Sequence, residues 1–127
     1  DLNLDLMESR FRSSIISFVK ISRAWNIKPI LMTQGNRIDH NLEYFQKWVV
    51  KYQRGEMTAR EFSDLYARIN QITREVAIQE NVTLIDLDSK IPKTNEFLYD
   101  TIHLNQAGSI LMGEIVSKEL AKVIQSQ

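Results

Sequence analysis

The chain has 127 residues, 43% of them hydrophobic and 25% charged, a composition typical of a single soluble globular domain. Its sixteen basic and sixteen acidic residues cancel, so charge gives no support for a nucleic-acid partner or a membrane partner. The lack of cysteine excludes disulfides and thiol chemistry, and two histidines form no cluster with metal-ligand spacing, so we expect no metal.

No apolar run approaches the length of a membrane-spanning helix, and no charged start followed by an apolar stretch indicates a signal peptide. If the chain begins inside a domain, an export signal would precede Asp1. Secreted, periplasmic and cytoplasmic locations are therefore not distinguishable from these residues.

The first predicted helix follows residue 7 and places four large side chains on one apolar face, with Val19 beside them. These four residues are Phe11, Ile15, Phe18 and Trp25. After a break at 26–28, the apolar run 29–33 predicts a strand buried on both faces, with its proline at the first position, where no ladder donor is lost.

Polar residues follow this strand, at the end where open parallel sheets bind ligands. Gln34 and Asn36 are therefore candidate walls of a site, although an ordinary solvent turn explains them equally well. Asp39 and His40 are adjacent, and adjacent loop residues rarely face each other, so we predict no acid–base pair there.

An aromatic-rich segment, 41–53, has helical spacing and leaves two interpretations open. Tyr44 and Trp48 either pack in a core or form a lid or pocket wall beside the presumed site. Thr58 and Glu61 then predict a capping box at the start of the next helix.

That next helix has the clearest apolar periodicity in the chain, carried by Phe62, Leu65, Ile69, Ile72 and Val76, with Arg68 and Glu75 among the residues expected to face solvent. Asn81 ends it, and the run 82–87 predicts a second strand. A helix between two short apolar strands indicates parallel pairing. Asp86 and Asp88, at the strand end, either cap the following turn or form a carboxylate pair.

After a loop over residues 89–98, Asp100 and His103 stand three residues apart, directly before the last predicted helix. If this loop is a tight turn, the Asp100 carboxylate accepts a hydrogen bond from Nδ1 of His103 and leaves Nε2 free to take a proton from a nucleophile. Asn105 is a suitable N-cap for the helix, whose apolar face carries Leu111, Met112, Ile115, Val116, Leu120 and Val123.

The stretch from Asp100 to Asn105, followed by Ala107, Gly108 and a helix, resembles the last conserved block of the SGNH hydrolases, the GDSL-like lipase and esterase family. The likeness is good over residues 97–120 and weaker upstream, where the family's nucleophilic serine block and oxyanion blocks are not found. The resemblance implies a serine ester hydrolase that acts on a small-molecule ester, with no cofactor. His103 would be the base and Asp100 its orienting partner.

The implied fold is α/β, a three-layer α/β/α doubly wound parallel sheet of the flavodoxin-like SGNH type. Residues 1–127 would form the C-terminal portion of one such domain, because two parallel strands cannot bury both faces of a sheet. We expect a missing N-terminal segment, or a second copy of the chain, to complete the sheet. The nucleophilic serine would lie outside this chain, and the chain alone is predicted to be inactive.

Two rival interpretations remain. One is a non-catalytic α/β binding module, a degenerate relative of the family that uses the aromatic segment at 44–48 as its binding surface. The other, a flavodoxin-like nucleotide or flavin binder, lacks the glycine-rich phosphate loop that it would need.

Overall fold

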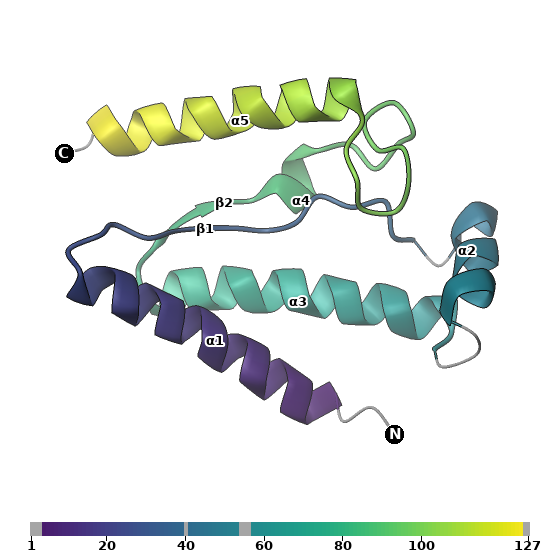
Figure 1. The fold of residues 1–127 in the computed structure, drawn as a ribbon, viewed down its shortest axis with the longest axis horizontal. Helices are drawn as coiled ribbons and strands as arrows, with labels where there is room; N and C mark the ends of the chain where they lie inside the picture. Colours follow the sequence, from purple (N-terminus) through teal and green to yellow (C-terminus); the bar gives the residue numbers. More distant parts are fainter. Residues whose placement is uncertain (1–3, 40, 54–56, 126–127) are drawn as a thin grey trace.

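The computed structural model describes residues 4–39, 41–53 and 57–125. In these ranges the elements are α1 (Leu4–Ala24), β1 (Ile30–Met32), α2 (Glu43–Gln53), α3 (Ala59–Gln79), β2 (Thr83–Ile85), α4 (Leu87–Lys90) and α5 (Gln106–Gln125). Figure 1 shows α5 on one side of the two strands, α1 and α3 on the other side, and α2 at one end of the molecule. None of the helices in the described ranges has the length and apolarity needed to cross a membrane.

The helices α1 and α3 bury one hydrophobic cluster against the strands. Its buried members are Val19, Leu31, Ile72, Val76 and Ala77. Phe11 and Ile15 pack against this cluster as predicted. Phe18 and Trp25 were predicted on the same face, but they are 52% and 77% exposed, so that part of the prediction is wrong. The buried stripe of α1 runs in steps of four residues through 11, 15 and 19, and residues 18 and 25 lie beside it on the helix surface.

Ion pairs along the outside of the same two helices connect α1 to α3. Arg68 of α3 lies 2.8 Å from Glu8 of α1 and 2.9 Å from Glu75, which also pairs with Arg12 of α1. We expected Arg68 and Glu75 to point to solvent. Their side chains are 38% and 34% exposed, and each also pairs with a residue of α1. The apolar periodicity of α3 gives no sign that a second helix lies against its charged side.

Both ends of α3 follow the sequence prediction. Thr58 Oγ1 accepts from the backbone N–H of Glu61 at 3.2 Å, and the Glu61 carboxylate accepts from the backbone N–H of Thr58 at 2.8 Å. Asn81 follows the helix with a φ of 50°, and Asn26 follows α1 with a φ of 56°. Asparagine tolerates this left-handed conformation better than most residues, so both helices end where the sequence places an asparagine.

The strands β1 and β2 pair in parallel, as predicted, with Leu31 opposite Leu84. Each strand is shorter than the apolar run that predicted it. Thr33 and Asp86, the residues that follow β1 and β2, direct their side chains into a polar network. Pro29, which precedes β1, has no N–H to offer to a ladder.

The second face of the strands is covered by α5. The buried residues there are Ile85, Leu87, Ile91 and Leu98, and Met112, Ile115 and Val116 of α5 pack against them. Residues 89–98 were predicted as a loop, but the segment begins inside α4, which is a single turn.

A third cluster lies between α2, the start of α3 and the loop after β1. Ile38, Phe45 and Val49 are buried, and Trp48, Phe62 and Tyr66 pack around them. The aromatic spacing of residues 41–53 therefore reflects core packing at Phe45 and Val49, which are 0% and 3% exposed.

The expected α/β fold, a three-layer α/β/α doubly wound parallel sheet, is wrong for this chain. The described residues are 65% helical, and their strands are β1 and β2, of three residues each. A doubly wound sheet needs several parallel strands side by side, and these residues supply one pair. The chain is mostly helical, with a small parallel ribbon between its helices.

Candidate functional site

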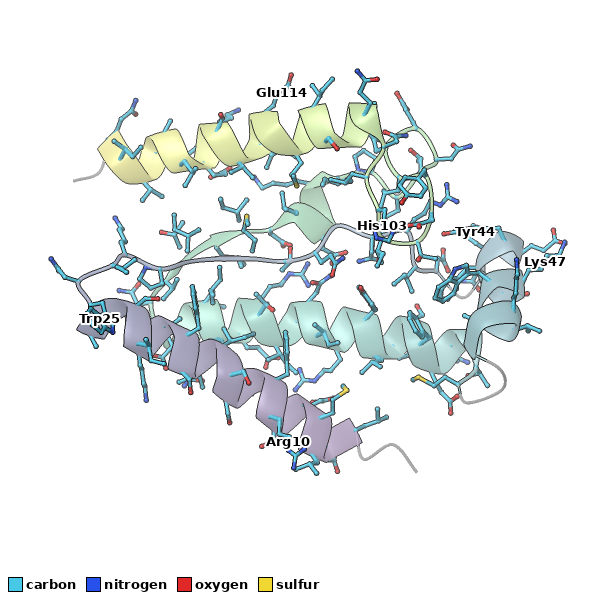
Figure 2. The ribbon with its side chains drawn as sticks, viewed as in Figure 1. Arg10, Trp25, Tyr44, Lys47, His103 and Glu114 are labelled. Atoms are coloured by element: carbon cyan, nitrogen blue, oxygen red, sulfur yellow. The ribbon has the colours of Figure 1, made fainter. Side chains whose placement is uncertain are left out.

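The loop between α4 and α5 forms the tight turn that the Asp100–His103 spacing requires. Leu98 and Leu104 form an antiparallel bridge, and the backbone N–H of Tyr99 donates to the carbonyl of His103 at 3.1 Å. Figure 2 places His103 at the end of the molecule where Tyr44 also lies, opposite the end that carries Trp25. The turn rests on Leu98, which is fully buried beneath α5.

Asp100 holds the turn and the imidazole together. Its Oδ1 accepts from the backbone N–H groups of Ile102 at 2.9 Å and His103 at 2.8 Å, and its Oδ2 lies 2.8 Å from Nδ1 of His103. Burial works to raise the pKa of Asp100, but these hydrogen bonds outweigh it and lower the pKa below its ordinary value. Asp100 is therefore a carboxylate at neutral pH.

Because a carboxylate only accepts hydrogen bonds, the proton of a neutral His103 lies on Nδ1. Its Nε2 then carries the free lone pair, and the side chain is 60% exposed. Within the described ranges, no serine hydroxyl hydrogen-bonds to this nitrogen. Ser109, the closest serine in sequence, lies in α5, where its N–H donates to the carbonyl of Asn105.

Asn105 and Gly108 fasten the turn to α5. Asn105 Oδ1 accepts from the N–H of Gly108 at 2.9 Å, which confirms its role as N-cap, and its Nδ2 donates to the carbonyl of Glu96 at 2.8 Å. A Cβ added to Gly108 would lie 2.0 Å from the carbonyl oxygen of Phe97. The motif that follows His103 therefore sets how closely α5 approaches the loop.

The loop after β1 contacts the same turn. The backbone N–H of Arg37 donates to the carbonyl of Thr101 at 2.8 Å. The Arg37 guanidinium lies 4.1 Å from the ring centroid of Tyr44, whose hydroxyl donates to the Arg37 carbonyl at 2.7 Å. Tyr44 therefore reaches the segment that supports the turn.

The other three candidate wall residues have separate surroundings. Gln34 is exposed, and its Oε1 accepts from the Tyr66 hydroxyl at 3.2 Å. Asn36 is 4% exposed and uses both ends of its amide, towards Asp88 and towards the backbone N–H of Ile38. Trp48 stacks on Phe45, with ring centroids 6.0 Å apart, inside the third cluster.

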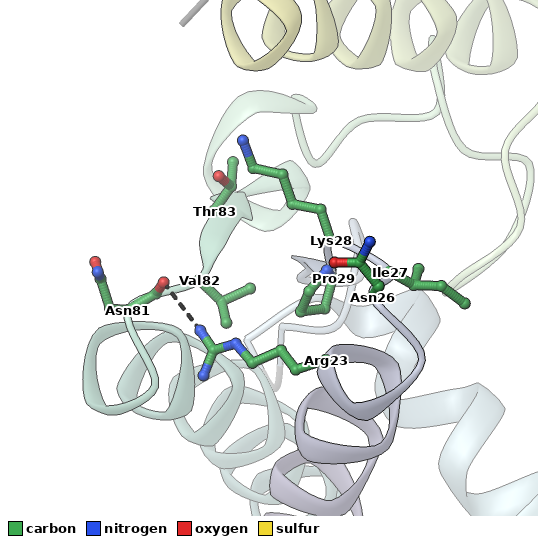
Figure 3. A pocket seen from close by; sticks show the side chains of 8 residues that line it. All are labelled: Arg23, Asn26, Ile27, Lys28, Pro29, Asn81, Val82 and Thr83. Carbon is green, nitrogen blue, oxygen red and sulfur yellow. Dashed lines mark hydrogen bonds between the residues drawn. The ribbon is translucent and has the colours of Figure 1, made fainter. Parts of the chain in front are cut away.

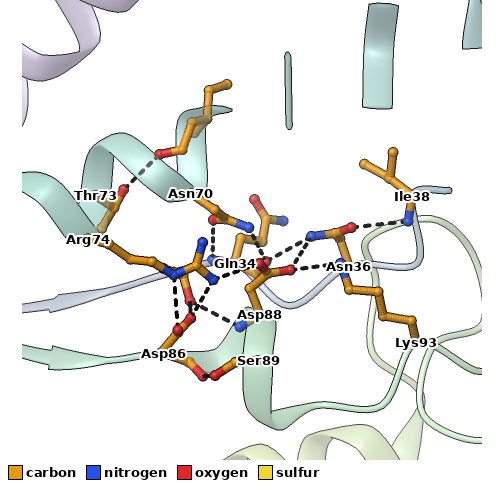
Figure 4. A network of polar contacts seen from close by, with 12 residues as sticks. Gln34, Asn36, Ile38, Asn70, Thr73, Arg74, Asp86, Asp88, Ser89 and Lys93 are labelled. Atoms are coloured by element: carbon orange, nitrogen blue, oxygen red, sulfur yellow. Dashed lines mark hydrogen bonds and ion pairs between the residues drawn. The ribbon is translucent and has the colours of Figure 1, made fainter. Parts of the chain in front are cut away.

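A polar network after β1 and β2 was not predicted from the sequence (Figure 4). Arg74 of α3 donates to both carboxylate oxygens of Asp86, at 2.8 and 3.0 Å, and to Asp88 at 2.8 Å. Thr33 donates to Asp86 at 2.6 Å. Both carboxylates are thus paired with a cation from α3, which is neither of the two roles that we considered. The only sequence feature that could have indicated this pairing is the position of Arg74 next to the apolar stripe of α3.

The cavities around these residues differ in their relation to His103. A cavity of about 450 Å³ lies at the other end of the strands, between Arg23, Lys28 and Asn81 (Figure 3). A second, of about 320 Å³, is lined by Gln34 together with Ile102 and Leu104, the two neighbours of His103 in sequence. The second cavity therefore lies beside the candidate site.

Among the described residues, no group of three or more histidine, aspartate or glutamate side chains is placed to hold a metal ion. His40, which we set aside as an acid–base partner for Asp39, lies outside the described residues. The chemistry of the described site therefore rests on Asp100 and His103, an orienting carboxylate and an imidazole with one free nitrogen.

Comparison with known proteins finds a relative with a similar sequence. No protein-family model matches the chain, and no solved structure matches it. Over 84 residues, which make up 62% of this chain, it is 34% identical to a Bacillus subtilis (strain 168) protein named uncharacterized lipoprotein YqeF. The match covers 33% of that protein, so the chain spans about a third of its relative's length.

Proposed function

We propose that this chain supplies the acid–base pair of a serine ester hydrolase. His103 takes the proton of an attacking serine through Nε2 and then returns it to the leaving group. Asp100 holds the imidazole in the Nδ1–H tautomer and balances the charge of the imidazolium that forms. The serine lies outside residues 1–127, in another segment of the encoded protein or in a second polypeptide.

The observation that carries this proposal is the contact of 2.8 Å between Asp100 Oδ2 and His103 Nδ1, made in a turn that leaves Nε2 unbonded. The second oxygen of Asp100 is fixed by two backbone N–H groups, so the carboxylate cannot rotate away from the ring. A hydrogen bond whose only role is to stabilise a surface loop does not require an imidazole with one free nitrogen.

The substrate class is an ester of a small molecule. The sequence resemblance covers esterases, lipases, acylhydrolases and carbohydrate deacetylases, which share the same acid–base step. The choice among them depends on loops around the acyl and alcohol groups.

The test is a comparison of two histidine variants in the complete product of the gene, assayed with a p-nitrophenyl ester. His103→Ala is expected to lower kcat by roughly 10³-fold or more, because members of a catalytic triad act as a unit. His40→Ala is the matched control and should leave the rate nearly unchanged. Equal losses from the two variants, or an unchanged rate in His103→Ala, would contradict the proposal.

A further inference from the structure

Tyr99 stacks on the imidazole of His103. The two ring centroids are 5.6 Å apart, and the ring planes differ by 14°. Nearly parallel rings at this separation have a favourable aromatic geometry. The backbone of Tyr99 also donates to the His103 carbonyl at 3.1 Å, so the two residues face each other across the turn.

The position of the Tyr99 side chain is not explained by burial. Tyr99 is 65% exposed, whereas its neighbour Leu98 is fully buried and fills the space beneath α5. An aromatic side chain this exposed adds little to a hydrophobic core. Its ring instead stacks on the imidazole of His103.

The imidazole needs a second contact if its direction is to be fixed. Asp100 holds the His103 ring at one atom, Nδ1, and the His103 side chain is 60% exposed. A ring held at one nitrogen can still tilt about that hydrogen bond, and tilting would swing Nε2 away from a fixed nucleophile. A flat surface against the ring removes this freedom.

We propose that Tyr99 is a positioning residue for His103. Its ring restricts the imidazole to one rotamer, and Asp100 selects the tautomer within that rotamer. The catalytic meaning of this restriction rests on the proposed function, but the restriction itself can be measured without any turnover.

The direct test is nuclear magnetic resonance of the 127-residue chain, comparing Tyr99→Ala with Tyr99→Phe. In the unsubstituted chain we expect contacts between the two rings and side-chain couplings of His103 that report one rotamer. Tyr99→Phe should keep both, because phenylalanine preserves the stacked face. Tyr99→Ala should give averaged couplings, while amide signals outside residues 97–105 stay in place and show that the fold is kept.

Averaged couplings in the unsubstituted chain, or a single His103 rotamer that persists in Tyr99→Ala, would overturn the inference.

The p-nitrophenyl ester assay gives a second test. Tyr99→Ala is expected to lower kcat about tenfold or more with KM nearly unchanged, whereas Tyr99→Phe should keep kcat close to that of the unsubstituted protein. If His103→Ala abolishes turnover and Tyr99→Ala does not alter kcat, the positioning role fails and the proposed function stands. If His103→Ala has no effect, the proposed function fails, and the couplings alone decide the role of Tyr99.

Discussion

Two glycines of α5 stand five residues apart in surroundings of opposite kind. A Cβ at Gly108 would lie 2.0 Å from the carbonyl oxygen of Phe97 and 2.9 Å from its carbonyl carbon, both of which are backbone atoms that cannot rotate away. A Cβ at Gly113 would meet nothing within 4 Å. The first glycine is required by the close approach of α5 to the loop, and the second only weakens the helix.

We predict that Gly108→Ala lowers the free energy of unfolding by about 1–3 kcal/mol, because the first turn of α5 must move away from Phe97. Gly113→Ala is the matched control. It should raise the same free energy by about 0.5–1 kcal/mol, since alanine is the better helix former. Urea denaturation of the two variants measures both changes, and a loss of stability in Gly113→Ala equal to that in Gly108→Ala would show that the contact with Phe97 does not decide the effect.

At the candidate site, the sequence was informative about residues that act on their immediate neighbours. Asp100, His103 and Asn105 interact within a few positions along the chain, so their spacing predicts their hydrogen bonds. The contact of Arg74 could not be predicted in this way, because Arg74 meets Asp86 only where α3 packs beside β2. Tyr99 is as close to His103 in sequence as Asp100 is, but no spacing rule predicts that its ring stacks on the imidazole.

Among the elements, the ends of β1 and β2 are joined to α3 by the pair of Arg74 and Asp86. Burial works to raise the pKa of Asp86, but hydrogen bonds from Arg74 and Thr33 outweigh it and lower the pKa from 3.8 to about 2. A carboxyl whose pKa is lower in the folded state stabilises that state above its unfolded pKa. This contribution is lost as the pH falls from about 3.8 through about 2.

We therefore predict that Asp86→Asn lowers the free energy of unfolding at pH 7 by about 1–3 kcal/mol, because Arg74 loses its main partner. The difference in the free energy of unfolding between Asp86→Asn and the unsubstituted chain should be constant from pH 7 to about pH 5. It should shrink as the pH falls below about 4. Urea denaturation at a series of pH values measures it, with Asp64→Asn, on the exposed side of α3, as the control. A difference that grows towards low pH would contradict this account of the pair.

The helices were easier to predict than the strands. The capping box at Thr58 and the stripe of α3 are local patterns. The structure confirms the capping box, and it buries Ile72 and Val76 of the stripe and half-buries the other three residues. Two of the four large side chains assigned to the stripe of α1, Phe18 and Trp25, are exposed, although they are as apolar as the residues that α3 covers. Helical periodicity indicates which residues share a face, but contact with a neighbouring helix decides which face is buried.

At the scale of the whole molecule, a short motif predicted the geometry of one turn correctly and the architecture incorrectly. The motif around His103 depends on six consecutive residues, whereas the extent of a sheet depends on how many strands lie side by side. The described residues place β1 beside β2 and cover the two faces with helices. The architecture that the family resemblance implied therefore contained more sheet than these residues form.

The central claim is that Asp100 and His103 work with a serine outside residues 1–127. The most direct measurement is the rate of p-nitrophenyl ester hydrolysis by the 127-residue chain alone, beside the rate of the complete gene product. We predict no rate above background for the chain, and a rate for the complete product that is lost when His103 is replaced by alanine. Hydrolysis by the chain alone that disappears when one of its own serines, such as Ser109, is replaced would contradict the claim.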